Sequence, residues 1–143
     1  MSFDLKVSKG DLVLDSSGDL KPVENYEKLI QDVLKILSTQ IGTHPFFPWY
    51  GSPITRALIG QSYEGKFVQS IASDQLRKSL ERLQTLQKDQ LRRAQTVTPD
   101  EQLAAVRNIK VERNPLDPRY YRILVTILTK AYRKVDTQVI VEL

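Results

Sequence analysis

The chain has 143 residues, a length that typically folds as one domain, and its 21 basic and 17 acidic residues give a net charge of +4. Both signs are mixed along most of the chain, whereas nucleic-acid-binding proteins usually concentrate positive charge on one face, so nucleic-acid binding is disfavoured. The absence of cysteine excludes disulfides, thiolate metal ligands and thiol nucleophiles. No run approaches the roughly 20 apolar residues of a membrane span. The N-terminus lacks the apolar segment of a secretory signal, so we expect synthesis in the cytoplasm.

The first forty residues are predicted to form a hairpin and then a helix. Residues 1–9 should be frayed. The turn-rich residues 16–19 separate two short apolar stretches within 11–20, which predicts a small hairpin or a strand with a loose return. A proline is tolerated in the first turn of a helix, and an apolar stripe follows Pro22, so we predict a helix over about 22–40. The stripe consists of Tyr26, Leu29, Ile30, Val33, Leu34 and Leu37.

Residues 42–53 are predicted to form a stiff loop, with Gly42 in a left-handed conformation at its start. The stretch holds three prolines, two glycines and four aromatic residues, and proline restricts both its own backbone and that of the preceding residue. The aromatic residues are Phe46, Phe47, Trp49 and Tyr50. At least one of Phe47 and Trp49 is predicted to anchor a partner, because an extended chain turns alternate side chains outward. The alternative is that all four fill the core of the domain.

Two further helices are predicted after this loop. Ser52 should cap a short helix that continues through Ile54 to Ile59. The chain then contains no proline or glycine from Lys66 to about residue 95, and apolar residues recur near helical spacing, which predicts a helix about 45 Å long. Its other faces are polar and include Gln84 and Gln87. Such a helix should extend beyond a small core and pack on another chain or form a short coiled coil.

The end of this helix carries a basic cluster that includes Arg92 and Arg93. One reading is a solvated helix face. The other is a contact with acidic residues of a partner, because arginine is enriched at protein interfaces and often contributes strongly to binding.

The last third changes to the period of strands. Thr98-Pro99-Asp100-Glu101 has the pattern of a capping box and predicts a short helix to about residue 107. Alternating residues over 109–113, over 120–129 and from Thr137 to the C-terminus predict three antiparallel strands within 109–143. We therefore predict one α+β domain over 1–143, in which an N-terminal hairpin and helices pack on a C-terminal three-stranded antiparallel meander.

The sequence offers little support for catalysis. His44 is the single histidine and cannot by itself form a triad or a metal site, so a packed or surface loop residue is the favoured interpretation. The glycines do not cluster as a phosphate-binding loop requires. A glycosidase needs a carboxylic acid in an apolar pocket, and the six carboxylates considered, Asp15, Asp19, Glu24, Glu64, Glu112 and Asp117, lie beside polar or turn residues or at strand ends. We predict no catalytic residue, cofactor or metal.

One motif carries a resemblance to a known family. The pattern Thr39-x-x-Gly42-x-x-Pro45-Phe46-x-Pro48-x-Tyr50-Gly51 follows an apolar helix and precedes a capped short helix. This resembles the baseplate wedge family of contractile-tailed phages, of the baseplate assembly protein W type, which has related subunits in type VI secretion systems. The motif region spans about thirty residues, and the order of elements is similar over most of the chain. The Glu-Pro-Arg motif of the family is missing here, and Gln40 and His44 stand where many members have arginine.

The resemblance implies a structural role in the virion, in the baseplate of a contractile tail assembled in the host cytoplasm. Such subunits bind the core formed by larger wedge proteins, and their C-terminal strands start the tail sheath by strand exchange, so the implied partners are wedge and sheath proteins. An unpaired edge strand can template another strand. The final strand, with Thr137, Val139 and Val141, is accordingly predicted to form an interface.

Two alternatives stay open. A tail-associated peptidoglycan hydrolase is suggested by the abundant carboxylates and by the lysozyme label of some relatives, and lysis of purified cell walls would decide it. A nucleic-acid-binding accessory protein is suggested by the isoelectric point near 9.3, and binding that weakens steeply with salt would be its signature.

Overall fold

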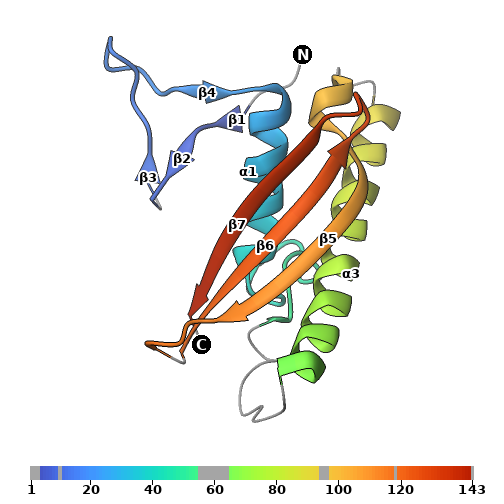
Figure 1. Cartoon of the computed structure of the whole chain (residues 1–143). Coiled ribbons are helices and arrows are strands. Elements are labelled where there is room, and N and C mark those ends of the chain that lie inside the picture. The colour runs from blue at the N-terminus through green and yellow to red at the C-terminus, as the bar shows by residue number, and fades with distance from the viewer. Residues whose placement is uncertain (1–3, 10, 55–64, 94–96, 118, 143) are drawn as a thin grey trace.

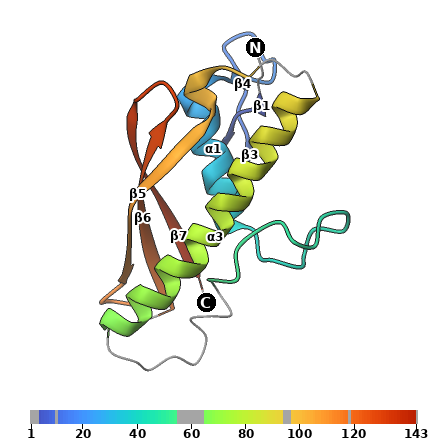
Figure 2. The ribbon, with the colours of Figure 1, turned by 90° about the vertical axis from the view of Figure 1, so that its right-hand side faces the viewer.

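A computed structural model describes residues 4–9, 11–54, 65–93, 97–117 and 119–142. The C-terminal part is a three-stranded antiparallel sheet in the order β5-β6-β7. Helices α1 (Asn25–Ser38) and α3 (Gly65–Arg92) cover one face of this sheet, and the other face carries no helix in the described part of the chain (Figures 1 and 2). The predicted α+β fold class is confirmed. The strands are β5 (Leu103–Arg113), β6 (Tyr120–Thr129) and β7 (Lys134–Glu142).

The core lies between the helices and the inner face of the sheet. Alternate residues of β6 from Tyr121 to Thr129 are buried, as the period of a strand requires. Ile36 is fully buried although it lies outside the apolar stripe of α1, because this helix contacts both α3 and β7 and therefore buries a wider face. The core residues of the helices are Leu29, Val33, Ile36, Leu37, Ala72, Leu76, Leu80 and Leu83.

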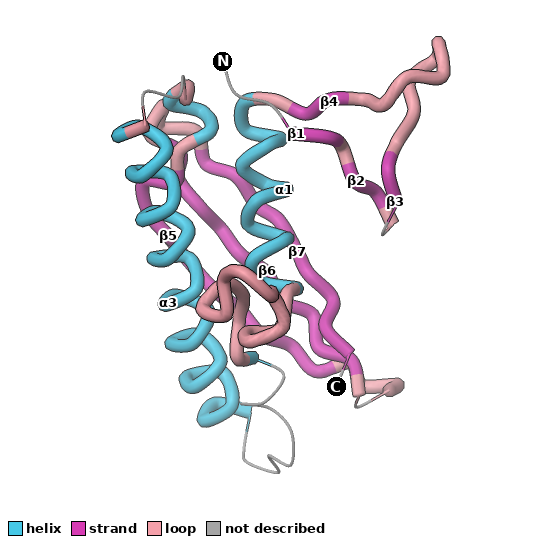
Figure 3. Tube along the Cα trace, turned by 180° about the vertical axis from the view of Figure 1, so that it is seen from behind, coloured by secondary structure: helices cyan, strands magenta, loops and turns pink. Residues whose placement is uncertain are grey.

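The N-terminal segment forms an arm beside α1 that differs from the prediction (Figures 1 and 3). Its residues 4–9 are not frayed, because β1 pairs with β4 and β2 pairs with β3. Pro22 belongs to β4, so the helix begins three residues later, at Asn25, and the predicted start was wrong. The turn predicted at residues 16–19 is confirmed, and Leu14 and Leu20 form an antiparallel bridge across it. The four strands are β1 (Asp4–Leu5), β2 (Val7–Ser8), β3 (Asp11–Leu12) and β4 (Pro22–Val23).

In the segment after Thr98, strand pairing prevents the helix that the capping-box pattern predicts. Thr98 N–H donates to Glu101 Oε2 at 3.1 Å, as the capping-box pattern predicts. However, the turn is only the 3₁₀ helix η1 (Pro99–Glu101), and the predicted helix to residue 107 was wrong, because Leu103 already pairs with Thr129 across the sheet. The last strand likewise begins at Lys134 and not at residue 137.

Helix α3 packs inside the domain along much of its length. Its buried positions extend from Ala72 to Gln87 and face β5 and α1. The apolar stripe of this helix thus packs on this chain's own sheet and on α1. The helix ends at Arg92, short of the predicted residue 95, and residues 94–96 lie outside the described part. Ser52 Oγ accepts a hydrogen bond from Ile54 N–H at 3.2 Å, and the rest of the predicted short helix lies outside the described residues. Over the described residues, none of the helices combines the length and apolarity that a membrane crossing requires.

Candidate partner-binding surfaces

The loop over residues 42–53, which we call the aromatic loop, is held by its own backbone. Ser52 N–H donates to Thr39 O at 2.8 Å, and Ile41 N–H donates to Ser52 O at 3.2 Å, so the two ends of the loop are joined. Gly42 N–H donates to Pro48 O at 2.9 Å across the loop, and Gly42 has the predicted positive φ, +89°. The loop is therefore preformed, which lowers the ordering entropy lost when a partner binds.

Gly51 explains one end of the family-like motif. Its φ is +115°, and a Cβ atom there would lie 2.5 Å from Thr39 O, so a side chain is excluded both by the backbone conformation and by this contact. The loop is also fixed to α3, because Ser79 Oγ donates to Gly51 O at 3.1 Å and Arg82 donates to Trp49 O at 3.4 Å. The motif residues Thr39 and Gly51 therefore serve to close the loop.

His44 organises the loop from within. Its Nδ1 accepts hydrogen bonds from Phe46 N–H at 3.3 Å and from Phe47 N–H at 3.1 Å. Its ring lies 5.1 Å from that of Phe47 and 6.0 Å from that of Tyr50, measured between centroids. The histidine is thus a packed loop residue, as the sequence favoured.

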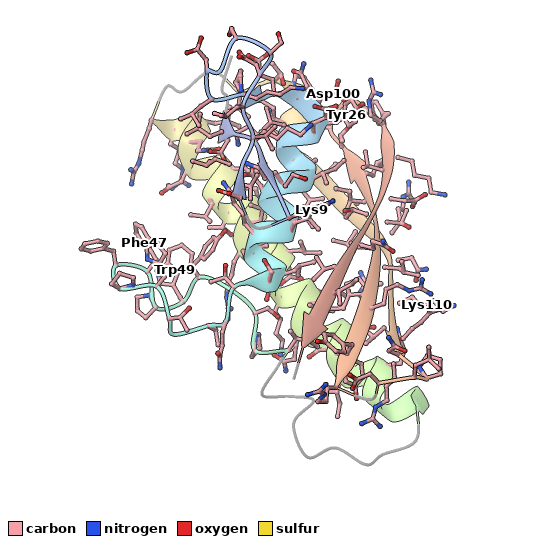
Figure 4. The ribbon with its side chains drawn as sticks, turned by 90° about the vertical axis from the view of Figure 1, so that its left-hand side faces the viewer. Lys9, Tyr26, Phe47, Trp49, Asp100 and Lys110 are labelled. Atoms are coloured by element: carbon pink, nitrogen blue, oxygen red, sulfur yellow. The ribbon has the colours of Figure 1, made fainter. Side chains whose placement is uncertain are left out.

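Three of the four loop aromatics are exposed, so the reading in which all four fill the core was wrong. Phe46 is 81% exposed, Phe47 49% and Trp49 42%, whereas Tyr50 is half-buried. Phe47 and Trp49 pack edge to face at 5.6 Å between centroids, and Figure 4 shows both on a loop that stands away from the helices. Contiguous exposed apolar surface of this kind marks interaction sites.

Two hollows flank Trp49. One, of about 330 Å³, is lined by His44, Phe47, Trp49, Tyr50 and Leu86. The other, of about 250 Å³, is lined by Trp49, Arg82, Thr85, Leu86 and Asp89. The loop and α3 therefore form one surface with an aromatic side chain at its centre.

A group of charges on α1 lies between this loop and the N-terminal arm. Burial and the negative charges of Asp32 and Asp4 raise the pKa of Tyr50 to about 12. Burial also raises the pKa of Asp32, although Lys28 pairs with it at 2.7 Å. Burial acts on Asp4 in the same direction but is outweighed by the hydrogen bond and charge of Lys35, so the pKa of Asp4 is lowered. This side of α1 therefore links the arm electrostatically to the loop.

The β5 edge of the sheet is covered by glutamine side chains from α3. Gln69 Oε1 accepts from Val111 N–H at 2.6 Å, and Gln69 Nε2 donates to Ile109 O at 2.8 Å. Gln87 Oε1 accepts from Leu103 N–H at 2.8 Å. These backbone groups point away from β6, so the glutamines occupy positions that a neighbouring strand would otherwise use.

The sequence did not reveal this role. Gln84 Nε2 also donates to Leu103 O at 3.2 Å, and Arg77 donates to Val106 O at 3.4 Å. The sequence predicts Gln84 and Gln87 on the polar faces of the helix, because glutamine is common on solvated helices. Only the position of α3 against β5 distinguishes the two roles.

The β7 edge is open in the described part of the chain, where no strand pairs with it on the side away from β6. Thr129 N–H donates to Arg133 O at 2.9 Å, and the register between the strands continues without a shift. Because bonded and non-bonded pairs alternate in an antiparallel ladder, Thr137 and Val139 bond to β6. Asp136, Gln138 and Ile140 therefore direct their N–H and C=O groups outward.

This geometry changes the meaning of the predicted interface on the last strand. Val139 is only 7% exposed and belongs to the core, and Thr137 is partly buried, so these side chains do not form an apolar surface for a neighbour. The side chain of Val141 lies outside the described residues. Ile140 is 67% exposed. What the strand offers is its backbone edge.

The predicted interface segments lie in two separate parts of the molecule: the aromatic loop with α3, and the edge of β7. Arg92 and Arg93 are exposed at the C-terminal end of α3, and Arg93 pairs with Asp89 at 3.7 Å. The aromatic loop lies on the far side of the helices from the sheet (Figure 2), whereas the open edge belongs to β7. The chain therefore has two candidate surfaces.

The comparisons with known proteins support the fold. No protein-family model matches the chain, and no curated protein matches it. A crystal structure from Geobacter sulfurreducens, named "putative tail lysozyme", shares the fold with a TM-score of 0.61 over 93% of this chain and 96% of that one. The two sequences are 12% identical, so the likeness concerns the fold alone.

Proposed function

We propose that this chain is a structural subunit of a contractile tail that joins neighbouring proteins through its open β7 edge. The observation that carries the proposal is the asymmetry of the sheet. Glutamines cover its β5 edge, whereas the outward backbone groups of β7 pair with no strand among the described residues. The shared fold with the protein named "putative tail lysozyme" supports the setting. A strand added to such an edge gains main-chain hydrogen bonds along its length.

In its finer form, the proposal makes the chain a baseplate wedge subunit that starts the tail sheath by strand exchange. The motif over Thr39–Gly51 supports this, since its residues build a rigid loop that leaves aromatic side chains on the surface. The loop would bind the wedge core, while β7 would accept a strand from the first sheath ring. The partners are thus other wedge proteins on one surface and sheath protein on the other.

A proline at position 138 tests strand addition. Gln138 directs its N–H outward, so Gln138→Pro removes a donor from the open edge and leaves the bonds to β6 in place. Tails assembled with this variant should lack extended sheaths under the electron microscope, and the control Gln138→Thr should support them. Extended sheaths on Gln138→Pro tails would contradict the proposal. Deleting residues 137–143 is a poorer test, because it removes Val139 from the core.

Peptidoglycan hydrolysis is a second candidate, favoured by the name of the structural neighbour. A glycosidase places one acid with a raised pKa across a cleft from a second carboxylate. Among the described carboxyl groups, the raised pKa belongs to Asp32, which is paired with Lys28 on α1 and lines neither hollow beside Trp49. The pure protein is expected to leave suspensions of cell walls turbid. Clearing that Asp32→Asn abolishes would establish the enzyme instead.

A further inference from the structure

The face of α3 beside Trp49 carries uncompensated positive charge. Arg82 and Asp89 line the smaller hollow, and Arg93 follows Asp89 by one helical turn. Arg92 lies on the flank of this face, about 80° around the helix from Arg82. Asp89 pairs with Arg93 at 3.7 Å, whereas Arg82 and Arg92 form no ion pair with a carboxylate in the described part of the chain. One turn before Arg82 on α3, Lys78 forms an ion pair with Asp74 at 3.2 Å. Two arginines are therefore left to attract negative charge.

The apolar part of the same surface indicates a second property of the partner, an apolar side chain. The larger hollow, beside Trp49 and Leu86, is lined without any Lys, Arg, Asp or Glu side chain. An apolar side chain of a partner could enter it and remove Trp49 and Phe47 from water, and tryptophan and arginine are the residues that most often dominate binding energy at interfaces. A suitable partner thus combines an apolar anchor with negative charge.

We propose that this surface binds an acidic segment of a partner protein, which inserts an apolar side chain beside Trp49 and places carboxylates against Arg82 and Arg92. This inference deepens the proposed function by naming the chemistry of the partner at the aromatic loop. Ten residues of helix separate the two arginines, which is about 15 Å, so about five residues of extended partner chain connect the two carboxylates.

A protein segment fits the surface better than a nucleic acid does. Nucleic acid needs a continuous line of cations along its phosphates. Here Asp89 lines the smaller hollow between the two arginines, where it would oppose a phosphate backbone. The larger hollow offers no cation for a phosphate.

Selection from a displayed library of random 16-residue peptides tests the inference on the full chain. Peptides are selected on the wild-type protein and counter-selected on Trp49→Ala, which alters a partly exposed side chain and should fold. The recovered peptides should carry net negative charge and a Phe, Leu, Met or Trp anchor. Recovery of basic or uncharged peptides, of peptides that bind Trp49→Ala equally, or of no enriched sequence would overturn the inference.

Fluorescence then measures the selected peptide at the site, because Trp49 is the single tryptophan of the chain. The peptide should change its emission, and Arg82→Glu with Arg92→Glu should weaken binding about tenfold or more, because each reversal places like charges against the acidic peptide. Arg82 also donates to Trp49 O, so Arg92→Glu alone, which leaves that bond in place, should weaken binding as well. Weakening by Arg82→Glu only would report the lost bond and contradict the charge requirement. The matched control is Lys130→Glu with Lys134→Glu, two exposed cations near the β6–β7 turn that change the net charge equally. Equal weakening by both pairs would reduce the effect to net charge and contradict the site.

Two further titrations separate the alternatives. A single-stranded oligothymidylate that displaces the peptide at lower concentration would identify a nucleic-acid site and overturn the protein partner. Gln138→Pro should bind the peptide as the wild type does, because β7 takes no part in this surface. Loss of peptide binding therefore reports on the loop, and loss of sheath assembly by Gln138→Pro reports on the proposed function.

Discussion

The two edges of the sheet differ in what contacts their outward backbone N–H and C=O groups. On β5, outward backbone groups at Val111, Ile109 and Leu103 are bonded by glutamines of α3. On β7, the outward groups of Gln138 and its alternate neighbours face no strand in the described structure. A protein that only had to avoid edge-to-edge association would be expected to cover both. The difference indicates that an added strand would pair with the β7 edge and not with the β5 edge.

The comparison makes a first prediction about adjacent residues of β7. Thr137→Pro removes an N–H that bonds to β6 and leaves a buried acceptor unpaired, so it should destabilise the fold by about 3 kcal/mol and lower Tm by about 10 °C. Gln138→Pro removes only an outward N–H and should cost about 1 kcal/mol or less. Thermal unfolding of both variants measures the difference. Equal losses would mean that the alternation assigned to this strand is wrong.

The covered edge should be sensitive to its glutamines. Gln87 is buried and also donates to Glu101 O at 2.9 Å, so Gln87→Ala leaves two backbone groups without their partner and should destabilise the protein by about 2 kcal/mol. Gln90→Ala, at a partly exposed position of the same helix, should change stability by less than about 0.5 kcal/mol. Urea unfolding of the two variants compares them, and a neutral Gln87→Ala would show that these bonds do not secure the edge.

Hydrogen exchange compares the edges without any substitution. The amide of Val111 is bonded to Gln69, so it should exchange at least about tenfold more slowly than the outward amide of Gln138. In Gln69→Ala the amide of Val111 should approach the rate of Gln138. Residue-resolved exchange followed by NMR provides the rates, and similar protection of both amides in the wild type would remove the contrast.

The smallest expected effect concerns the charges that tie β5 to β6. Hydrogen bonds from Lys110 and Arg122 lower the pKa of Glu112 to about 2 from its ordinary 4.5. The ionised group therefore stabilises the fold above pH 4.5, and this contribution is lost as the pH falls through about 2. Glu112→Gln should flatten the stability profile between these values, only slightly because the pair is exposed to solvent. If Glu112→Gln leaves the stability between pH 2 and pH 4.5 unchanged, these charges contribute nothing to the pairing of β5 with β6.

The fold class could be predicted from the sequence, because periodicity is a local property. The apolar stripe of α1, the alternation of β6 and the prolines and glycines of the aromatic loop all follow from the chemistry of neighbouring residues. The predicted boundaries that were wrong lie where strand pairing with a distant segment competes with a local signal. Pro22 pairs with Leu5 and therefore belongs to a strand, and Leu103 pairs with Thr129 and therefore does not continue the capped turn as a helix.

The sequence by itself determined that α1 and α3 are helical, that β6 is extended and that the aromatic loop is rigid, since these features depend on spacing, on proline and on glycine at positive φ. The tertiary structure alone decided which edge of the sheet is open, because that depends on where the glutamines of α3 meet β5. It also decided that Val139 lies in the core while Trp49 lies on the surface. Both side chains are apolar, and only the packing around each determines whether a partner can reach it.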